Sequence, residues 1–85
     1  MSETNKQILR VISTLVCDLF GADAAAISLD TSRDDVPGWD SLQHVNLIID
    51  VERHFQVHLP EDRVSSIQTV GDMVDAVSAA LTTER

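Results

Sequence analysis

The stretch PGWDSLQHVNLIIDVERHF, residues 37–55, decides the fold, because it joins a turn, a helix start and an amphipathic helix in one run. Its Pro-Gly dipeptide is typical of a turn. Asp40 follows, where a carboxylate accepts hydrogen bonds from free backbone N–H groups, and Gln43 completes a capping-box pattern. The run therefore predicts a helix from about Ser41 to Phe55. Ser41 would then lie at the exposed start of a rigid element, within reach of a modifying enzyme.

Apolar residues at helical spacing predict further helices on both sides. Ile8, Ile12, Leu15 and Leu19 indicate a first helix over about residues 5–20, with Gly21 as its stop. A short helix or turn should follow Pro60 and point Val64 and Ile67 inward. Thr69-x-x-Asp72 opens a last helix. Its expected buried stripe consists of Val70, Met73, Val74, Val77 and Leu81.

No segment alternates with period two, so the sequence predicts an all-α fold. We expect a four-helix bundle with one short third helix and a long loop between helices one and two. Ile27 and Leu29 are the expected anchors of that loop. Residues 1–85 are expected to form a single domain.

Composition excludes several classes of function. The net charge of -8 disfavours nucleic acid and anionic membrane surfaces as partners, and it either suits basic protein partners or simply keeps a small domain soluble. There is no apolar run long enough for membrane insertion and no signal-peptide pattern.

Cys17 is the single cysteine of the chain, so an internal disulfide is excluded, and its place in the first helix predicts an inward side chain. Asp50, His54 and His58 do not amount to a metal site.

The segment Gly38-Trp39-Asp40-Ser41-Leu42, followed by a helix that ends in Glu52-x-x-Phe55, resembles the phosphopantetheine attachment site of acyl carrier proteins. The resemblance continues through the loop residues Ile27 to Ser32 and through Leu59-Pro60-Glu61-Asp62 and residues 67–74. It covers nearly the whole chain. Asp-Ser-Leu alone is a weak motif, but its order and spacing relative to these flanking segments make the pattern specific.

The resemblance implies a covalent cofactor. A phosphopantetheinyl transferase (holo-carrier synthase) would move 4′-phosphopantetheine from coenzyme A onto Ser41 Oγ, between Asp40 and Leu42. The thiol of the arm would carry acyl groups as thioesters to acyl-loading, condensing and acyl-transfer enzymes. The tether raises the local concentration of the acyl group at a docked enzyme. No catalytic residue and no metal ion of the chain itself is implied, and we expect a cytoplasmic monomer.

The predicted helix over residues 41–55 carries more apolar surface than one packing face needs. One row contains Leu47, Ile48, Val51 and Phe55. A second row of Leu42, Val45 and Ile49 starts beside Ser41, and the two together exceed an arc of roughly 100°. Either the third helix covers the second row, or the row meets a partner enzyme or the mouth of an acyl-chain cavity. Val64 and Ile67 are candidates for the same contact.

The sequence leaves three further alternatives open. Asp40, Ser41 and His44 are the residue types of a hydrolytic triad, but one helix start does not place a base, an acid and an oxyanion hole around one substrate. Trp39 either packs the loop against the helix or shapes the surface that a partner reads. The whole chain could also be an unmodified interaction or scaffold domain, or a peptidyl or aminoacyl carrier.

One departure from the family pattern bears on the pathway. Carriers of general fatty-acid synthesis usually have an acidic second helix. Here Asn46, Arg53 and His54 stand where acids are common, and Trp39 replaces a small residue. The departure favours a specialised lipid, polyketide or related biosynthetic pathway.

Overall fold

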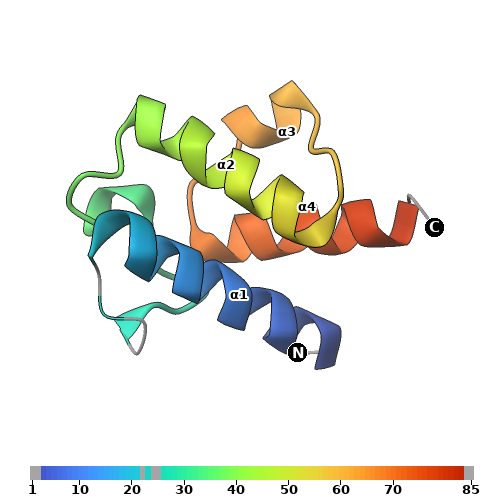
Figure 1. Ribbon diagram of the computed structural model, residues 1–85, viewed down its shortest axis with the longest axis horizontal. Coiled ribbons are helices and arrows are strands. Elements are labelled where there is room, and N and C mark those ends of the chain that lie inside the picture. The colour runs from blue at the N-terminus through green and yellow to red at the C-terminus, as the bar shows by residue number, and fades with distance from the viewer. Residues whose placement is uncertain (1–2, 22, 24–25, 84–85) are drawn as a thin grey trace.

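The structure is a computed structural model that describes residues 3–21, 23 and 26–83. Its elements are α1 (Glu3–Phe20), a short 3₁₀ turn η2 (Arg33–Asp35), α2 (Ser41–Phe55), α3 (Glu61–Ser65) and α4 (Val70–Thr83). Figure 1 shows α1 and α2 in front, α4 behind them, and the short α3 beside α2. The predicted all-α architecture, with its short third helix and long first loop, is confirmed.

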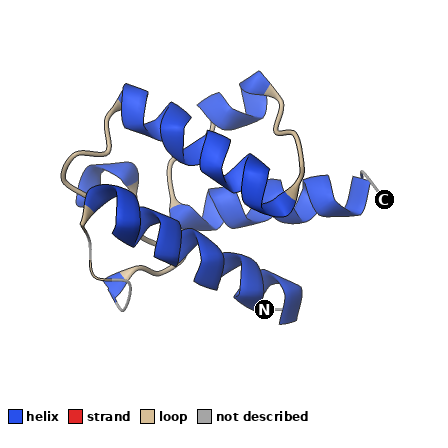
Figure 2. Cartoon of the chain, in the orientation of Figure 1, coloured by secondary structure: helices blue, strands red, loops and turns tan. Residues whose placement is uncertain are grey.

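The helix boundaries agree closely with the periodicity of the sequence. The observed limits of α2 are those predicted, whereas α1 begins at Glu3 rather than near residue 5. Gly21 ends α1 with a φ of 71°, and its N–H donates to the Cys17 carbonyl over 2.8 Å. Figure 2 shows helices joined by loops; the described part of the chain contains no strand beyond a bridge between Ser32 and Thr69.

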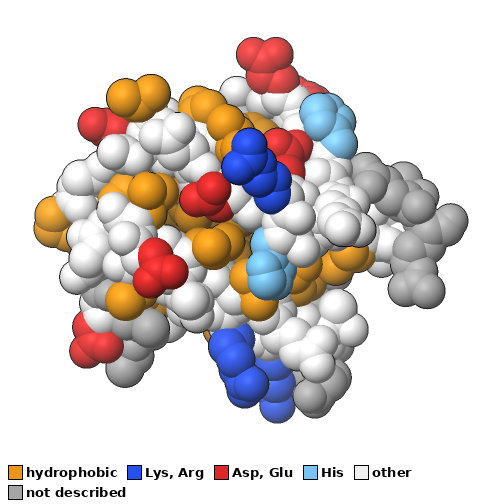
Figure 3. Space-filling model, in the orientation of Figure 1, with side chains coloured by type: hydrophobic (Ala, Val, Ile, Leu, Met, Phe, Trp, Pro, Cys, Tyr) orange, Lys and Arg blue, Asp and Glu red, His pale blue; other side chains and the backbone are white. Residues whose placement is uncertain are grey.

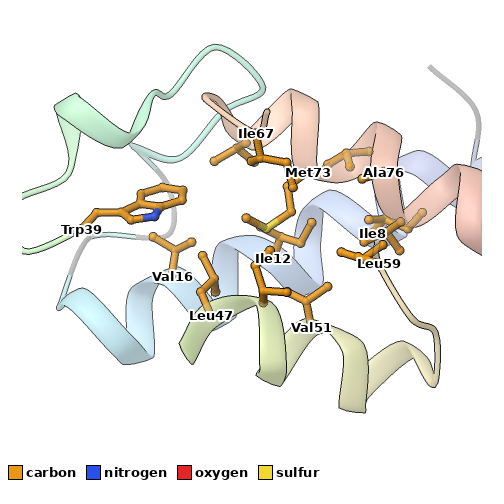
Figure 4. Close-up of a cluster of buried hydrophobic side chains, with 14 of the residues drawn as sticks. Ile8, Ile12, Val16, Trp39, Leu47, Val51, Leu59, Ile67, Met73 and Ala76 are labelled. Carbon is orange, nitrogen blue, oxygen red and sulfur yellow. The ribbon is translucent and has the colours of Figure 1, made fainter. Parts of the chain in front are cut away.

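The core lies where α1, α2 and α4 meet (Figure 4). These helices bury side chains at spacings of three and four, which is the pattern of a core-facing stripe. The buried members from these helices are Ile8, Ile12, Val16, Leu47, Ile48, Val51, Val70, Met73, Val74, Ala76 and Val77. Leu15, Leu19 and Leu81, predicted in the stripes, are only partly buried against this core.

The inward placement predicted for Cys17 is wrong. Cys17 is only half-buried, whereas its neighbour Val16 is fully buried. Val16 follows Ile8 and Ile12 by steps of four, so it occupies the inward position. Cys17 is turned away from that line by one residue of helical rotation.

The loop between α1 and α2 is fastened to the start of α4. Val70 N–H donates to Thr31 O and Gly71 N–H donates to Leu29 O, each over 2.9 Å. A Cβ atom at Gly71 would lie 2.9 Å from the Leu29 carbonyl oxygen, so this approach requires glycine. Ile27 and Leu29 pack against the core, as predicted. The loop therefore reaches the turn before α2 from a fixed base.

Candidate functional site

The turn before α2 has the geometry that its residues favour. Gly38 has a φ of 90°, and Trp39 N–H donates to Val36 O over 3.2 Å. A proline followed by a glycine with positive φ is the sequence pattern of a type II turn. The turn brings the chain to Asp40 in an extended conformation, ready for a helix start.

Asp40 caps α2, as predicted. Its side chain accepts from Gln43 N–H over 2.9 Å. The reciprocal half of the capping box does not form, because the Asp40 N–H donates to Gly38 O and the Gln43 side chain accepts from Asn46. Ser41 is the first residue of α2 and its side chain is exposed. The partial positive charge of a helix N-terminus favours a phosphate group at this position.

Trp39 belongs to the core and not to the surface. It is 6% exposed and stacks on Phe20 with 5.4 Å between ring centroids. Its indole N–H donates to His44 Nδ1 over 3.0 Å. The packing interpretation of Trp39 is therefore confirmed, and a docking enzyme does not meet this side chain.

His44 joins three segments. It is 5% exposed, and its Nε2 lies 3.2 Å from the Val64 carbonyl oxygen in α3. Since Nδ1 accepts from the indole, Nε2 carries the proton and donates to Val64 O. Both ring nitrogens are occupied, so His44 is not a general base for Ser41, and a hydrolytic triad is excluded.

Burial is the main influence on the protonation of His44. It lowers the pKa of the ring below the ordinary 6.5; the hydrogen bond to Val64 opposes this lowering, and the Arg33 guanidinium adds to it. From the sequence, His44 is predicted only as a triad member, and its link between Trp39 and Val64 is missed. Its position on the face of Leu47, Ile48 and Val51 was the available signal.

The outer row of α2, defined as Leu42, Val45 and Ile49, is exposed. Its members retain 69%, 50% and 41% of their accessible surface, so α3 does not cover them. Figure 3 shows hydrophobic side chains at the surface on the face where α2 lies. Asn46 and Arg53 are exposed on the same helix. Ser41 thus borders an apolar strip.

The remaining candidates from α3 and the following turn lie deeper. Ile67 is 1% exposed and Val64 is half-buried against the core. Their predicted inward orientation is confirmed. Ile67 is not available to a docking enzyme, and an acyl-chain contact for either residue stays a prediction.

Two acids in and before α2, Asp40 and Glu52, make contacts that hold this part of the structure. Glu52 Oε2 accepts from Leu59 N–H over 2.8 Å and lies 3.3 Å from His58 Nδ1. Asp40 is occupied as the cap. Of the acids in this segment, Asp50 remains, and it is half-buried. Of these carboxylates, Asp40 is the exposed one, although one of its oxygens is used in the cap.

Among the described residues, 3–21, 23 and 26–83, there is neither a membrane-spanning helix nor a cluster of metal ligands. No helix among them is long and apolar enough to cross a membrane. No group of three or more His, Cys, Asp or Glu side chains among them could hold a metal ion.

Comparison with known proteins identifies the family. Residues 10–77 match the model of the phosphopantetheine attachment site family. An acyl carrier protein of Tropheryma whipplei is 31% identical over 80 residues, which cover 94% of this chain and 98% of that protein. One from Porphyromonas gingivalis is 32% identical over 81 residues, covering 95% and 99%.

Solved structures agree with these relatives. The solution structure of a holo acyl carrier protein from Geobacter metallireducens aligns with a TM-score of 0.78 and 29% identity, covering 89% of this chain and 87% of that one. A crystal structure from Thermotoga maritima aligns with a TM-score of 0.85 and coverages of 98% and 96%; at 19% identity it shows the fold alone. The chain belongs to the acyl carrier protein family. Its members carry 4′-phosphopantetheine covalently and are carriers, not enzymes.

Proposed function

We propose that Ser41 is the attachment residue of 4′-phosphopantetheine and that this member of the family carries acyl intermediates for a specialised lipid, polyketide or related pathway. The observation that carries the first part is the exposed Ser41 hydroxyl at the start of α2, directly after the capping Asp40. A phosphopantetheinyl transferase would join Ser41 Oγ to the phosphate of the pantetheine arm and release the nucleotide part of coenzyme A. The arm then supplies the thiol that binds acyl groups as thioesters.

The residues present suit this group. Ser41 is accessible, and the helix N-terminus favours the phosphate that links the arm to the protein. The outer row begins at the next residue, so an enzyme that grips Leu42, Val45 and Ile49 has the arm directly beside it. Exposed apolar patches next to a modification site are typical of protein interfaces. Acyl-loading, condensing and acyl-transfer enzymes are the proposed partners, and a cytoplasmic location and a monomeric state stay predictions.

The specialised pathway is supported by the charge of α2. Asp40 and Glu52 are engaged in capping and in holding the loop before α3, whereas Arg53 is exposed beside the outer row. An enzyme that recognises a strongly acidic helix would meet an apolar strip and a guanidinium here. The peptidyl or aminoacyl carrier is the nearest variant of this proposal.

The alternative from another class is an interaction domain that is never modified. The exposed outer row favours it as much as it favours a carrier, since either would dock through apolar contacts. Intact-mass measurement separates the two. The protein is incubated with coenzyme A and a broad-specificity transferase, and we expect the mass to rise by one phosphopantetheine group.

Two variants localise the modification. Ser41→Ala should abolish the mass increase while melting near the wild-type temperature, because Asp40 still caps α2. Ser65→Ala is the matched control, an exposed serine within α3 whose loss should leave the mass increase intact. A Ser41→Ala protein that still gains the group would contradict the assignment. A wild-type protein that never gains it would favour the unmodified interaction domain.

A further inference from the structure

α3 is the least firmly packed helix of the bundle. None of its residues is fully buried. A cavity of about 330 Å³ lies between the segment that enters α3 and the second half of α4, lined by His58, Leu59, Pro60, Arg63, Ala76, Ala79 and Ala80. On the opposite side α3 contacts the core through Val64, whose carbonyl oxygen accepts the hydrogen bond from His44. That bond fixes the distance between α3 and the start of α2.

The bond is part of a longer chain of contacts. The Trp39 indole N–H donates to His44 Nδ1, and His44 Nε2–H donates to Val64 O. Trp39 is held in turn by its stack on Phe20 at the end of α1. The segment before Ser41, the first turn of α2 and the middle of α3 are therefore coupled through one imidazole ring.

This arrangement requires a neutral ring. A protonated His44 would present an Nδ1–H to the indole N–H, so two donors would face each other across 3.0 Å. It would also place a charge in a site that is 5% exposed. Protonation therefore breaks the contact with Trp39, whereas Nε2–H can still donate to Val64 O.

We propose that His44 is a positioning residue whose neutral form holds α3 against the start of α2, and so fixes the composite surface that enzymes meet beside Ser41. The consequence at Ser41 rests on the proposed function, whereas the contact between His44 and Val64 does not. When His44 takes up a proton, the contact with Trp39 is lost, so α3 is no longer tied through the ring to the segment before Ser41. The arrangement of the surface beside Ser41 then depends on the protonation of His44, a residue that does not contact the cofactor.

The charges around His44 support the neutral form. Arg33 of η2 acts on the ring and opposes its protonation, in the same direction as burial. Arg63 of α3 is exposed and lines the cavity on the other side of that helix, and Asp40 of the α2 start is exposed and directed to Gln43 N–H. The Trp39 N–H also favours an unprotonated Nδ1, because it is a hydrogen bond that only the neutral ring accepts. Acidification below the ordinary pKa of histidine is therefore the condition that breaks the tie between Trp39 and α3.

The contact is tested without any modification enzyme. NMR of the histidine rings should show His44 as the Nε2–H tautomer, with a pKa below the ordinary 6.5 of histidine. The backbone resonances of α3 should shift with the same midpoint as His44. In Trp39→Phe the ring stack is kept but the N–H donor is lost, so the His44 pKa should rise toward its ordinary value. An Nδ1–H tautomer, or a His44 titration that leaves α3 unchanged, would overturn the proposal.

The consequence for Ser41 is tested by steady-state pantetheine transfer. Loss of one hydrogen bond should raise the KM of His44→Gln for the transferase about two- to tenfold, with kcat little changed. The ratio of wild-type to His44→Gln kcat/KM should fall as the pH drops through the His44 titration. His54→Gln, an exposed histidine of the same helix, is the control and should match the wild type at every pH.

The two arms separate two kinds of failure. If wild-type protein accepts no pantetheine, the proposed function fails while the NMR arm still decides on the contact. If pantetheine is transferred but His44→Gln keeps the wild-type KM and pH profile, the positioning role is refuted.

Discussion

The two faces of α2 are built from the same kinds of apolar residue, but one face is buried and the other is exposed. The inner face buries Leu47 and Val51 completely, whereas the outer row leaves Leu42 at 69% and Ile49 at 41% exposure. The difference is one of helical phase, since Leu47 and Ile49 are two residues apart and point to different sides of the helix. Apolar composition alone therefore says nothing about which side chains stabilise this fold.

The two faces of α2 contribute to different properties of the protein. Burial of the inner face removes apolar surface from water and stabilises the fold, at roughly 25 cal/mol per Å². The outer row remains largely in contact with water, so that gain is still available when a partner covers it. Substitutions on the inner face should thus change the free energy of unfolding, and those on the outer row should change the affinity for partners.

Leu47→Ala tests the inner face and should have the largest effect. Leu47 is 0% exposed in the centre of the core, so its truncation should lower the free energy of unfolding by about 2–5 kcal/mol. Urea denaturation followed by circular dichroism measures the loss. A loss below about 1 kcal/mol would mean that the core collapses around the deletion, and the contrast between the faces would weaken.

Asp40→Ala tests the helix start that both faces share. Its carboxylate accepts from Gln43 N–H, and loss of such a cap costs about 1 kcal/mol. The same denaturation experiment measures this cost. Asp40→Asn is the matched control, because an asparagine side chain also caps a helix and should keep most of the stability. Equal losses in both variants would show that the charge of Asp40 matters more than its hydrogen bond.

The elements of the fold were predictable because they follow from local patterns. The limits of α2 come from Asp40 and from the apolar period, and the start of α4 comes from the Thr69–Asp72 pattern, whose side chains do bond each other's backbone N–H groups. Both signals lie within a few residues of the feature that they predict.

The features that were missed depend on contacts between distant segments. His44 and Val64 are 20 residues apart in the sequence, and only the packing of the helices places the imidazole of His44 between Trp39 and Val64. Likewise the sequence left open whether α3 covers the outer row, because the position of a five-residue helix is not encoded in its own period. The prediction for Cys17 failed for a local reason, because Cys17 lies one residue past the inward position that Val16 occupies in α1.

Arg53→Glu tests what lies at the rim of the outer row. The substitution places an acid in the last turn of α2, and unfavourable interaction with the helix dipole should cost about 0.3–1 kcal/mol of stability. A rim charge chiefly sets the encounter rate and the choice of partner. We expect tighter binding to enzymes built for acidic carriers and weaker binding to the partner from this protein's own pathway.

Binding titrations of Arg53→Glu against both kinds of enzyme, at two salt concentrations, measure these changes in affinity. Arg10→Glu is the control, since it changes the net charge equally from an exposed site on α1. If Arg53→Glu alters neither affinity nor its salt dependence, α2 is not the docking face, and the inference of a specialised pathway loses its main support.

Ile49→Ala should change stability least and therefore gives the sharpest contrast with Leu47→Ala. Ile49 is 41% exposed, so the burial lost is partial, and alanine is the better helix former. The free energy of unfolding should stay within about 0.5 kcal/mol of the wild type. Affinity should nevertheless fall by about 1 kcal/mol or more for every partner that docks over Ser41, because the apolar centre of an interface supplies most of its energy. Isothermal titration on folded protein measures this, with Leu47→Ala as the reciprocal control that loses stability but keeps its affinity per folded molecule. A large loss of stability in Ile49→Ala would place the outer row in the core, and an unchanged affinity would leave the exposed apolar strip without a partner.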